Sequence, residues 1–325
     1  MKLNIRELRG RANALAAEHR PAIRQLVLLY CGVIALLSLG SSGLNLYLDS
    51  QIGTTGGLDG MGLRSVLQTI QEILSLINQF FGPFWSAGFL LAVIAMVQGD
   101  APQCRMLTGG FRRFFPILGH IAFRFMVMIA VGVTAVNISA VVFSFTPLGR
   151  RFAEGMAPIL EDPNLFLPDG TVNLELIPQE LLVEAGLPLT ALMLAVFGLV
   201  YLYLSYHFRL SMYLVVRDSV GAFRAHFLSL RLMRGHKWSL LKLDLSWWWY
   251  YLLTVLIGVV GYLDMVLSMM GIPLPMDDTV MFFATMAAYC VLITALSLWK
   301  KCQVDASYVL AYEQILAPMN EEGTL

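Results

Sequence analysis

The chain has 325 residues, of which 58% are apolar and 14% are charged, whereas soluble domains average about 45–50% and about 25%. A soluble fold of this length could not bury so much apolar surface, and the same composition excludes a disordered chain. Lysine and arginine number 22 and aspartate and glutamate number 22, so the chain lacks the excess positive charge of a nucleic-acid-binding protein. The composition therefore predicts an integral membrane protein with no nucleic-acid partner.

The first 24 residues form a polar segment rich in arginine. Apolar residues recur within it at the spacing of one helix face, namely Leu8, Ala12, Leu15 and Ala16. This pattern predicts a cytoplasmic amphipathic N-terminal segment, 1–24, whose helix lies along the inner surface of the membrane.

Six stretches of the chain are apolar and long enough to cross the hydrocarbon core, which takes about 20 residues of helix. We expect an all-α membrane protein in which residues 25–325 form a bundle of six transmembrane helices, with interfacial amphipathic helices beside it. The expected spans are 25–48, 66–98, 125–145, 187–208, 246–269 and 279–299.

The second span is unusual because its two halves differ. Residues 66–79 are amphipathic, Gly82 and Pro83 follow, and residues 84–97 are wholly apolar but too short to span alone. One long helix kinked at Pro83 explains this pattern, since the proline ring removes a backbone hydrogen bond and crowds the preceding turn. A re-entrant hairpin is the alternative.

Two further segments flank the spans. Residues 111–123 carry Arg112 and Arg113 and predict a short interfacial helix before the third span. The largest segment on the opposite side, 146–186, is acidic and contains a turn signal at Asp169. We expect an outer acidic cap there, which is either a solvated loop or a surface that captures a ligand.

Positive charges are distributed unequally across the expected spans. Of the 22 lysines and arginines, 17 fall on the side that holds both termini, three fall on the other side and two lie at span ends. Of the 22 acidic residues, nine fall on the side that holds both termini, eleven fall on the other side and two lie in the spans. Because lysine and arginine favour the cytoplasmic side, we expect both termini to be cytoplasmic, and an even number of spans agrees with this.

The longest loop on the basic side predicts a helix over residues 219–234. Ser219 or Asp218 supplies the N-terminal cap, and Gly235 ends the helix in a left-handed turn. Apolar side chains share one face, namely Phe223, Phe227, Leu230 and Met233. We expect this cytoplasmic basic helix and the residues after it to contact anionic lipid headgroups through Arg224, Arg231, Arg234, Lys237 and Lys242. Topology alone also explains the charge, and a nucleotide- or protein-binding role is a further alternative.

Aromatic residues accompany this loop. Trp238 and the run Trp247-Trp248-Trp249-Tyr250-Tyr251 mark the expected inner interface of the membrane, where aromatic rings prefer to sit.

The same region carries the pattern Ser229-x-x-Leu232-Met233-x-Gly235-x-Lys237-Trp238-x-Leu240, followed by Leu243-x-Leu245-Ser246. This pattern resembles the signature of the domain-of-unknown-function 975 family. Other parts of the chain are similar to that family as well, namely residues 206–218, Arg6-Glu7-Leu8 and residues 306–313. The resemblance implies a bacterial six-span membrane protein, and it carries no reaction, ligand or site residue with it.

The residues that resemble catalytic or metal-binding motifs are not placed where such a site would need them. Gly40-Ser41-Ser42-Gly43 matches the nucleophile motif of rhomboid intramembrane proteases by letters, but all five histidines map to the opposite half of the membrane. No histidine pair has metalloprotease spacing, and no glycine-rich phosphate loop is present. We therefore expect no enzyme activity, no catalytic residue, no cofactor and no metal site.

Three polar residues fall within the expected spans: Glu72, Asn137 and Asp264. An ionisable group inside a membrane is costly and therefore hints at function. We expect these residues either to serve packing and solvation at the interface or to form a polar pathway.

The sequence favours a multi-pass protein of the bacterial cytoplasmic membrane that acts as a non-enzymatic binding, accessory or stress-response component. Its expected partner is the lipid bilayer, through anionic headgroups on the cytoplasmic side, and a protein partner is left open. The alternative is a small-molecule transporter or channel that uses the kinked second span and the intramembrane polar residues. A membrane-embedded lipid enzyme would require clustered acid and base groups, which the sequence does not offer.

Overall fold

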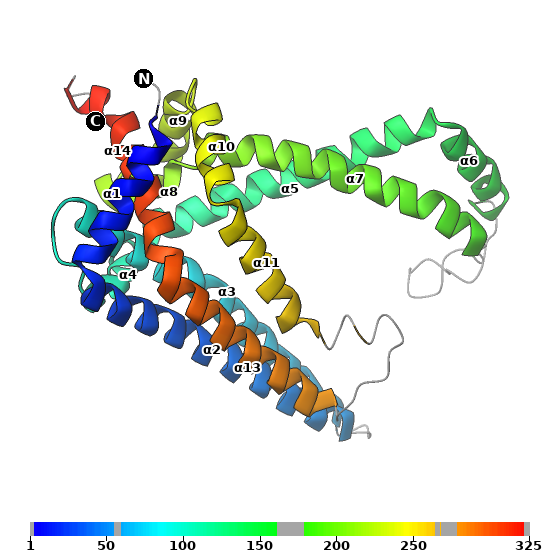
Figure 1. The fold of residues 1–325 in the computed structure, drawn as a ribbon. Helices are drawn as coiled ribbons and strands as arrows, with labels where there is room; N and C mark the ends of the chain where they lie inside the picture. Colours follow the sequence, from blue (N-terminus) through cyan, green and yellow to red (C-terminus); the bar gives the residue numbers. More distant parts are fainter. Residues whose placement is uncertain (1–2, 55–59, 161–178, 264–266, 268–277, 322–325) are drawn as a thin grey trace. The chain divides into compact units, whose positions relative to one another are not determined.

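A computed structural model describes residues 3–54, 60–160, 179–263, 267 and 278–321. Every regular element in these residues is helical (Figure 1). The helices form two compact units, which we call the terminal unit (Met1–Gly119 and Leu210–Leu325) and the central unit (His120–Arg209). The expected all-α class is confirmed.

Five helices in the described residues are long and apolar enough to cross a membrane, and a bent helix pair raises the number to six. These segments are Arg20–Leu44, Gln79–Val97, Phe114–Ser144, Pro188–Asp218 and Val280–Ala317, with the pair Lys237–Ser246 and Trp248–Gly261. Each of them overlaps one of the six spans expected from the sequence. The chain is therefore a multi-pass helical membrane protein.

Three long helices form one side of the terminal unit. Helix α2 (Arg20–Thr54) packs against both α3 (Gly60–Val97) and α13 (Asp278–Leu296) (Figure 1). The indole Nε1 of Trp85 in α3 donates a 3.1 Å hydrogen bond to the carbonyl oxygen of Tyr30 in α2. Helix α3 continues without a break through Pro83, so the second span is one helix and the re-entrant alternative is wrong.

The fifth span is bent at Trp247. Helices α10 (Lys237–Ser246) and α11 (Trp248–Gly261) meet there at 63°. The Trp247 side chain is only 1% exposed, and its Nε1 donates a 3.1 Å hydrogen bond to the hydroxyl oxygen of Ser307 in α14 (Cys302–Glu321). This ring, which the sequence placed at the membrane interface, is therefore a core residue. The expected span 246–269 begins at the bend, and its last residues lie mostly outside the described part of the chain.

Replacing Trp247 with phenylalanine is expected to lower the free energy of unfolding by about 1–2 kcal/mol, because the change removes a buried hydrogen bond and part of a filled volume. Titration of the purified protein with sodium dodecyl sulfate in mixed micelles measures this loss. The matched variant is Trp248→Phe, since that neighbouring ring is 60% exposed. Equal stability of the two variants would show that the Trp247 contact contributes nothing.

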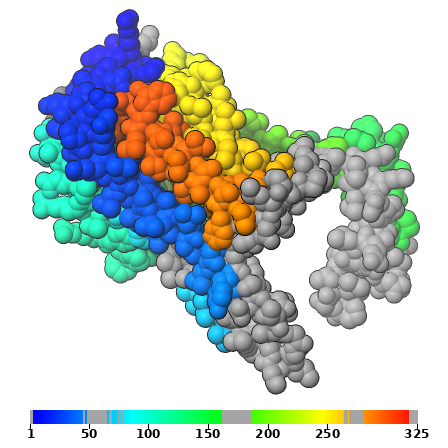
Figure 2. Space-filling view, turned by 60° about the horizontal axis from the view of Figure 1, so that its bottom comes forward, coloured from blue at the N-terminus to red at the C-terminus, as the bar shows by residue number. Residues whose placement is uncertain are grey.

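The N-terminal helix α1 (Ile5–Glu18) packs its apolar stripe on other helices of the protein. Its predicted apolar stripe is confirmed for Leu8, Ala12 and Ala16, which are all buried. This stripe faces α14, and Figure 2 shows the blue N-terminal helices directly against the orange C-terminal segment. Because α14 covers this stripe, it is not free to face lipid, and the position of the helix along the inner surface of the membrane stays a prediction.

The segment before the third span differs from its prediction. Residues 111–123 do not form a separate interfacial helix, because the backbone breaks at Arg113. Helix α4 (Gly109–Arg112) ends before the break, and α5 (Phe114–Ser144) runs on from it as one continuous helix.

The central unit contains most of α5 together with α6 (Pro147–Leu160) and α7 (Gln179–Phe208). Helix α6 contacts α7, and Arg124 of α5 donates a 3.1 Å hydrogen bond to the Tyr201 hydroxyl of α7. The expected outer cap 146–186 therefore begins as a helix and ends as the first turns of α7. Residues 161–178, in its middle, lie outside the described part of the chain.

Candidate functional site

The candidate site lies at one end of the terminal unit, which we call the basic end. Figure 1 shows that this end gathers α1, α9 (Ala222–Leu232), α10 and the C-terminal part of α14 near the two termini. It also holds most of the positive charges that the sequence analysis assigned to the cytoplasmic side.

The predicted basic helix 219–234 is shorter than expected at both ends. Ser219 has a φ of 56° and closes the preceding helix α8 (Ser211–Asp218), so neither it nor Asp218 caps α9. An N-cap residue takes an extended backbone, and Gly221 fills that position with a ψ of 144°. The left-handed turn expected at Gly235 is confirmed, with a φ of +86°.

Helix α9 turns three small residues and one histidine towards the protein. Its buried residues are Ala222, Ala225, His226 and Ser229. Phe223 and Phe227 lie one turn apart on another face and are 62% and 65% exposed. Of the predicted apolar face, Phe223 and Phe227 are confirmed as exposed neighbours, Leu230 is half-buried, and Met233 is buried just beyond the helix and is not part of that face.

The positive charges lie next to these exposed rings. Arg224 and Arg231 are seven residues apart, which is two helical turns, so they lie on one side of α9. The ring of Trp238 in the following helix is exposed as well. Four of the five predicted lipid-contacting residues are exposed and Lys237 is half-buried. We call the following set the α9–α10 surface: Phe223, Arg224, Phe227, Arg231, Arg234, Trp238 and Lys242.

Helix α8, which precedes α9, is tied to the C-terminal helix by a polar cluster. The Tyr213 hydroxyl donates a 2.5 Å hydrogen bond to Oε1 of Glu313, and Nη1 of Arg217 lies 3.1 Å from Oε2 of the same carboxylate. Asp218 adds a second carboxylate 3.6 Å from Nε of Arg217. This cluster holds α8, the helix that leads into the α9–α10 surface, against α14.

A cleft of about 580 Å³ gathers four arginines at the same end. Arg105 comes from the short helix η1 (Cys104–Thr108), Arg112 and Arg113 from the end of α4, and Arg217 from α8. The guanidinium of Arg113 also donates a 3.3 Å hydrogen bond to the carbonyl oxygen of Val215. The sequence analysis used these arginines only to assign topology. These arginines come together through contacts between residues about 100 positions apart, such as Arg113 and Val215, so no local sequence pattern could predict the cleft.

The structure does not test the expected polar pathway of Glu72, Asn137 and Asp264. Glu72 is exposed on α3 in the terminal unit. Asn137 is exposed on α5 in the central unit, and its amide Nδ2 donates a 2.7 Å hydrogen bond to the carbonyl oxygen of Val133 in its own helix. Asp264 lies outside the described residues. The pathway stays a prediction.

Comparison with protein families gives one match, over residues 58–289, to the family described as Protein of unknown function (DUF975). The chain belongs to this family. The resemblance found in the sequence is thus confirmed for this range, which includes the α9–α10 surface and the arginine cleft of this DUF975 protein. The similarity predicted at residues 6–8 and 306–313 lies outside the matched range. No curated protein and no solved structure matches the chain.

Proposed function

We propose that this DUF975 protein is a non-enzymatic binding or accessory component of the bacterial cytoplasmic membrane, and that its α9–α10 surface contacts anionic lipid headgroups from the cytoplasmic side. One observation carries the proposal. Phe223 and Phe227 are exposed beside Arg224 and Arg231, while the opposite face of α9 is buried against the protein.

This arrangement matches the physical requirements of an interfacial helix. Exposed aromatic rings enter the boundary between headgroups and acyl chains, where their apolar bodies leave water. Each arginine or lysine near an anionic surface contributes about 1 kcal/mol of attraction, which decays within a Debye length. Because small residues hold α9 against the protein, the helix can present its rings and cations to the membrane without being free to turn.

The test uses the full chain in nanodiscs of phosphatidylcholine, with and without phosphatidylglycerol. Hydrogen–deuterium exchange of residues 222–234 is expected to slow in the anionic discs, and added salt should reverse the effect. In the variant Arg224→Gln/Arg231→Gln this protection is expected to disappear.

A matched control removes two adjacent exposed arginines from α6, in Arg150→Gln/Arg151→Gln, and should keep the protection. Identical exchange of α9 in neutral and anionic discs would overturn the proposal.

A further inference from the structure

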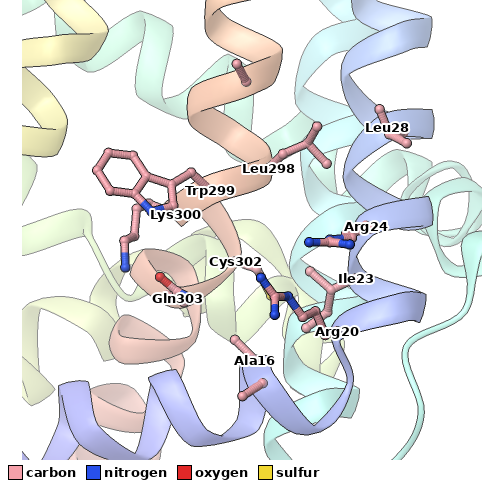
Figure 3. Close-up of a pocket in the computed structure, with 12 residues that line it drawn as sticks. Ala16, Arg20, Ile23, Arg24, Leu28, Leu298, Trp299, Lys300, Cys302 and Gln303 are labelled. Carbon is pink, nitrogen blue, oxygen red and sulfur yellow. The ribbon is translucent and has the colours of Figure 1, made fainter.

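A second cavity at the basic end, of about 640 Å³, lies between the start of α2 and the end of α13, with α1 beside it (Figure 3). Arg20 and Arg24 reach it from α2, and Lys300 lines it from the other helix, with its side chain pointing away from the two arginines (Figure 3). The ion pairs found among the described residues include Arg217 with two carboxylates and Lys301 with Asp305, and none is found for these three cations. The cavity therefore concentrates positive charge that no carboxylate in the described part of the chain neutralises.

A π-helical turn, η3 (Ser297–Lys301), separates the roles of two adjacent lysines. Lys301 turns inwards, where its Nζ lies 3.0 Å from a carboxylate oxygen of Asp305 and 4.8 Å from the ring centre of Phe89. Lys300 lies instead at the cavity, beside the Trp299 ring. Single π-helical turns inside α-helices occur frequently at functional sites, since they redirect side chains without ending the helix.

The cavity has an apolar wall next to its charged part. Leu28 follows Arg24 by one turn along α2, and Leu298 precedes Lys300 on the approaching helix. Because α2 enters the expected membrane at the level where α13 leaves it, both leucines lie deeper than the cations. Trp299 is 59% exposed at the boundary, a depth that suits an indole ring. A small soluble anion has no apolar part that could pack against this wall.

Gln303 adds a hydrogen-bonding group to the lining. Its Oε1 is buried and has no hydrogen-bond partner among the described residues. An unsatisfied buried acceptor costs free energy, so a ligand that supplies a hydroxyl donor would bind favourably there. A phosphodiester alone offers only acceptors, whereas a glycerol headgroup offers hydroxyls.

We propose that this cavity binds one anionic glycerophospholipid with a hydroxyl-bearing headgroup. The phosphate lies at Arg20 and Arg24, Lys300 adds positive charge from the other wall, a headgroup hydroxyl donates to Gln303, and the glycerol backbone and upper acyl chain cover the apolar wall. A volume of about 640 Å³ is in the range of small-molecule sites. The proposal rests on the proposed function only in that the basic end faces anionic lipid, because the two sites share no residue.

Native mass spectrometry of the full chain, titrated in detergent with phosphatidylglycerol, tests the proposal. We expect one tightly bound lipid per chain and much weaker binding of phosphatidylcholine. The variant Arg20→Gln/Arg24→Gln/Lys300→Gln is expected to bind phosphatidylglycerol roughly 100-fold more weakly, because each cation near an anionic headgroup contributes a factor of about five. The control Arg224→Gln/Arg231→Gln should keep the bound lipid, so failure of this proposal is distinguishable from failure of the α9–α10 contact.

A second variant leaves the charges in place. Ala17 is exposed at the cavity, so Ala17→Trp fills the space without entering the core, and we expect it to displace the lipid. The variant Gln303→Leu should reduce the preference for phosphatidylglycerol over phosphatidic acid. Glycerol phosphate, the soluble headgroup, is expected to bind far more weakly than the lipid.

Three outcomes would overturn the proposal. One is equal affinity for glycerol phosphate and phosphatidylglycerol, which would indicate a site for free phosphate compounds. The others are unchanged lipid binding in Ala17→Trp and equal binding of phosphatidylcholine and phosphatidylglycerol.

Discussion

The variant Gly88→Ala is expected to lose more than about 4 kcal/mol of unfolding free energy, or to fail to accumulate as folded protein. A Cβ atom at this position in α3 would lie 1.9 Å from the carbonyl oxygen of Leu107 in η1 and 2.5 Å from its carbonyl carbon. Both atoms belong to the backbone, so no side-chain rotation can relieve the clash. Helix α3 and η1 would have to separate.

The same close approach requires a second glycine. A Cβ at Gly110 in α4 would lie 2.0 Å from the carbonyl oxygen of Phe84 and 3.0 Å from the backbone nitrogen of Gly88. Separation at either glycine would move η1 and α4, which carry two of the four arginines of the cleft and lead directly into Arg113. Gly110→Ala is therefore expected to be as damaging as Gly88→Ala.

Gly32→Ala is the matched control for these variants. Gly32 lies within α2, and a Cβ atom added there would meet no described neighbour within 4 Å, so alanine fits. Because glycine inside a helix costs roughly 0.5–1 kcal/mol relative to alanine, this variant should be as stable as the parent or slightly more so. Detergent titration of all three variants measures the differences, and comparable stability of Gly88→Ala and Gly32→Ala would contradict the close packing of α3.

Hydropathy predicted the spans because a membrane imposes a length and a composition that a sequence must display. The continuity of α3 could not be decided in the same way, since Gly82 and Pro83 are compatible with a kink and with a hairpin. The bend at Trp247 escaped prediction for a related reason. A tryptophan at the expected membrane boundary is usually interfacial, but contacts with residues far away in sequence, Ser307 and Arg9, bury this ring in the core.

Periodicity identified the apolar stripe of α1 correctly but could not say what covers it. Leu8 and Ala12 would look the same in sequence whether they faced lipid or α14. The prediction that α9 begins at residue 219 was wrong for a different reason. Serine is a favoured N-cap residue, so Ser219 looked suitable as the cap. Its left-handed backbone closes α8 instead, and a serine in that conformation leaves no sequence signal.

The two basic sites differ in how far the sequence could reveal them. The α9–α10 surface is local, so its rings and cations could be read from helical spacing. Lys301 and Asp305 also have a legible i,i+4 spacing. By contrast, the phospholipid cavity joins Arg20 to Lys300, and these residues meet only because α2 packs beside α13. The charge count placed both residues on one side of the membrane, but it could not predict that they line the same cavity.

Glu313→Gln is expected to lower the free energy of unfolding by about 2–3 kcal/mol, since one carboxylate serves two partners from α8. The variant keeps the side-chain shape but removes the charge that faces Arg217 and the strong acceptor of the Tyr213 hydroxyl. The side chains of Arg217 and Glu313 are only 19% and 25% exposed, so solvent replaces the lost pairing incompletely. The neighbouring Asp218 retains part of the compensation, which keeps the loss below that of a fully buried pair.

A double-mutant cycle with Tyr213→Phe separates the two partners of the carboxylate. If the hydroxyl stabilises the fold through Glu313, the loss in Tyr213→Phe should shrink in the Glu313→Gln background, with a coupling of about 1 kcal/mol or more. Glu7→Gln is the matched control, because Glu7 is exposed on α1 and its loss should change stability by less than about 0.5 kcal/mol. Strictly additive losses at Tyr213 and Glu313 would mean that their short hydrogen bond does not hold α8 to α14. The Arg217–Glu313 ion pair would then be the polar contact of Glu313 that holds α8 to α14.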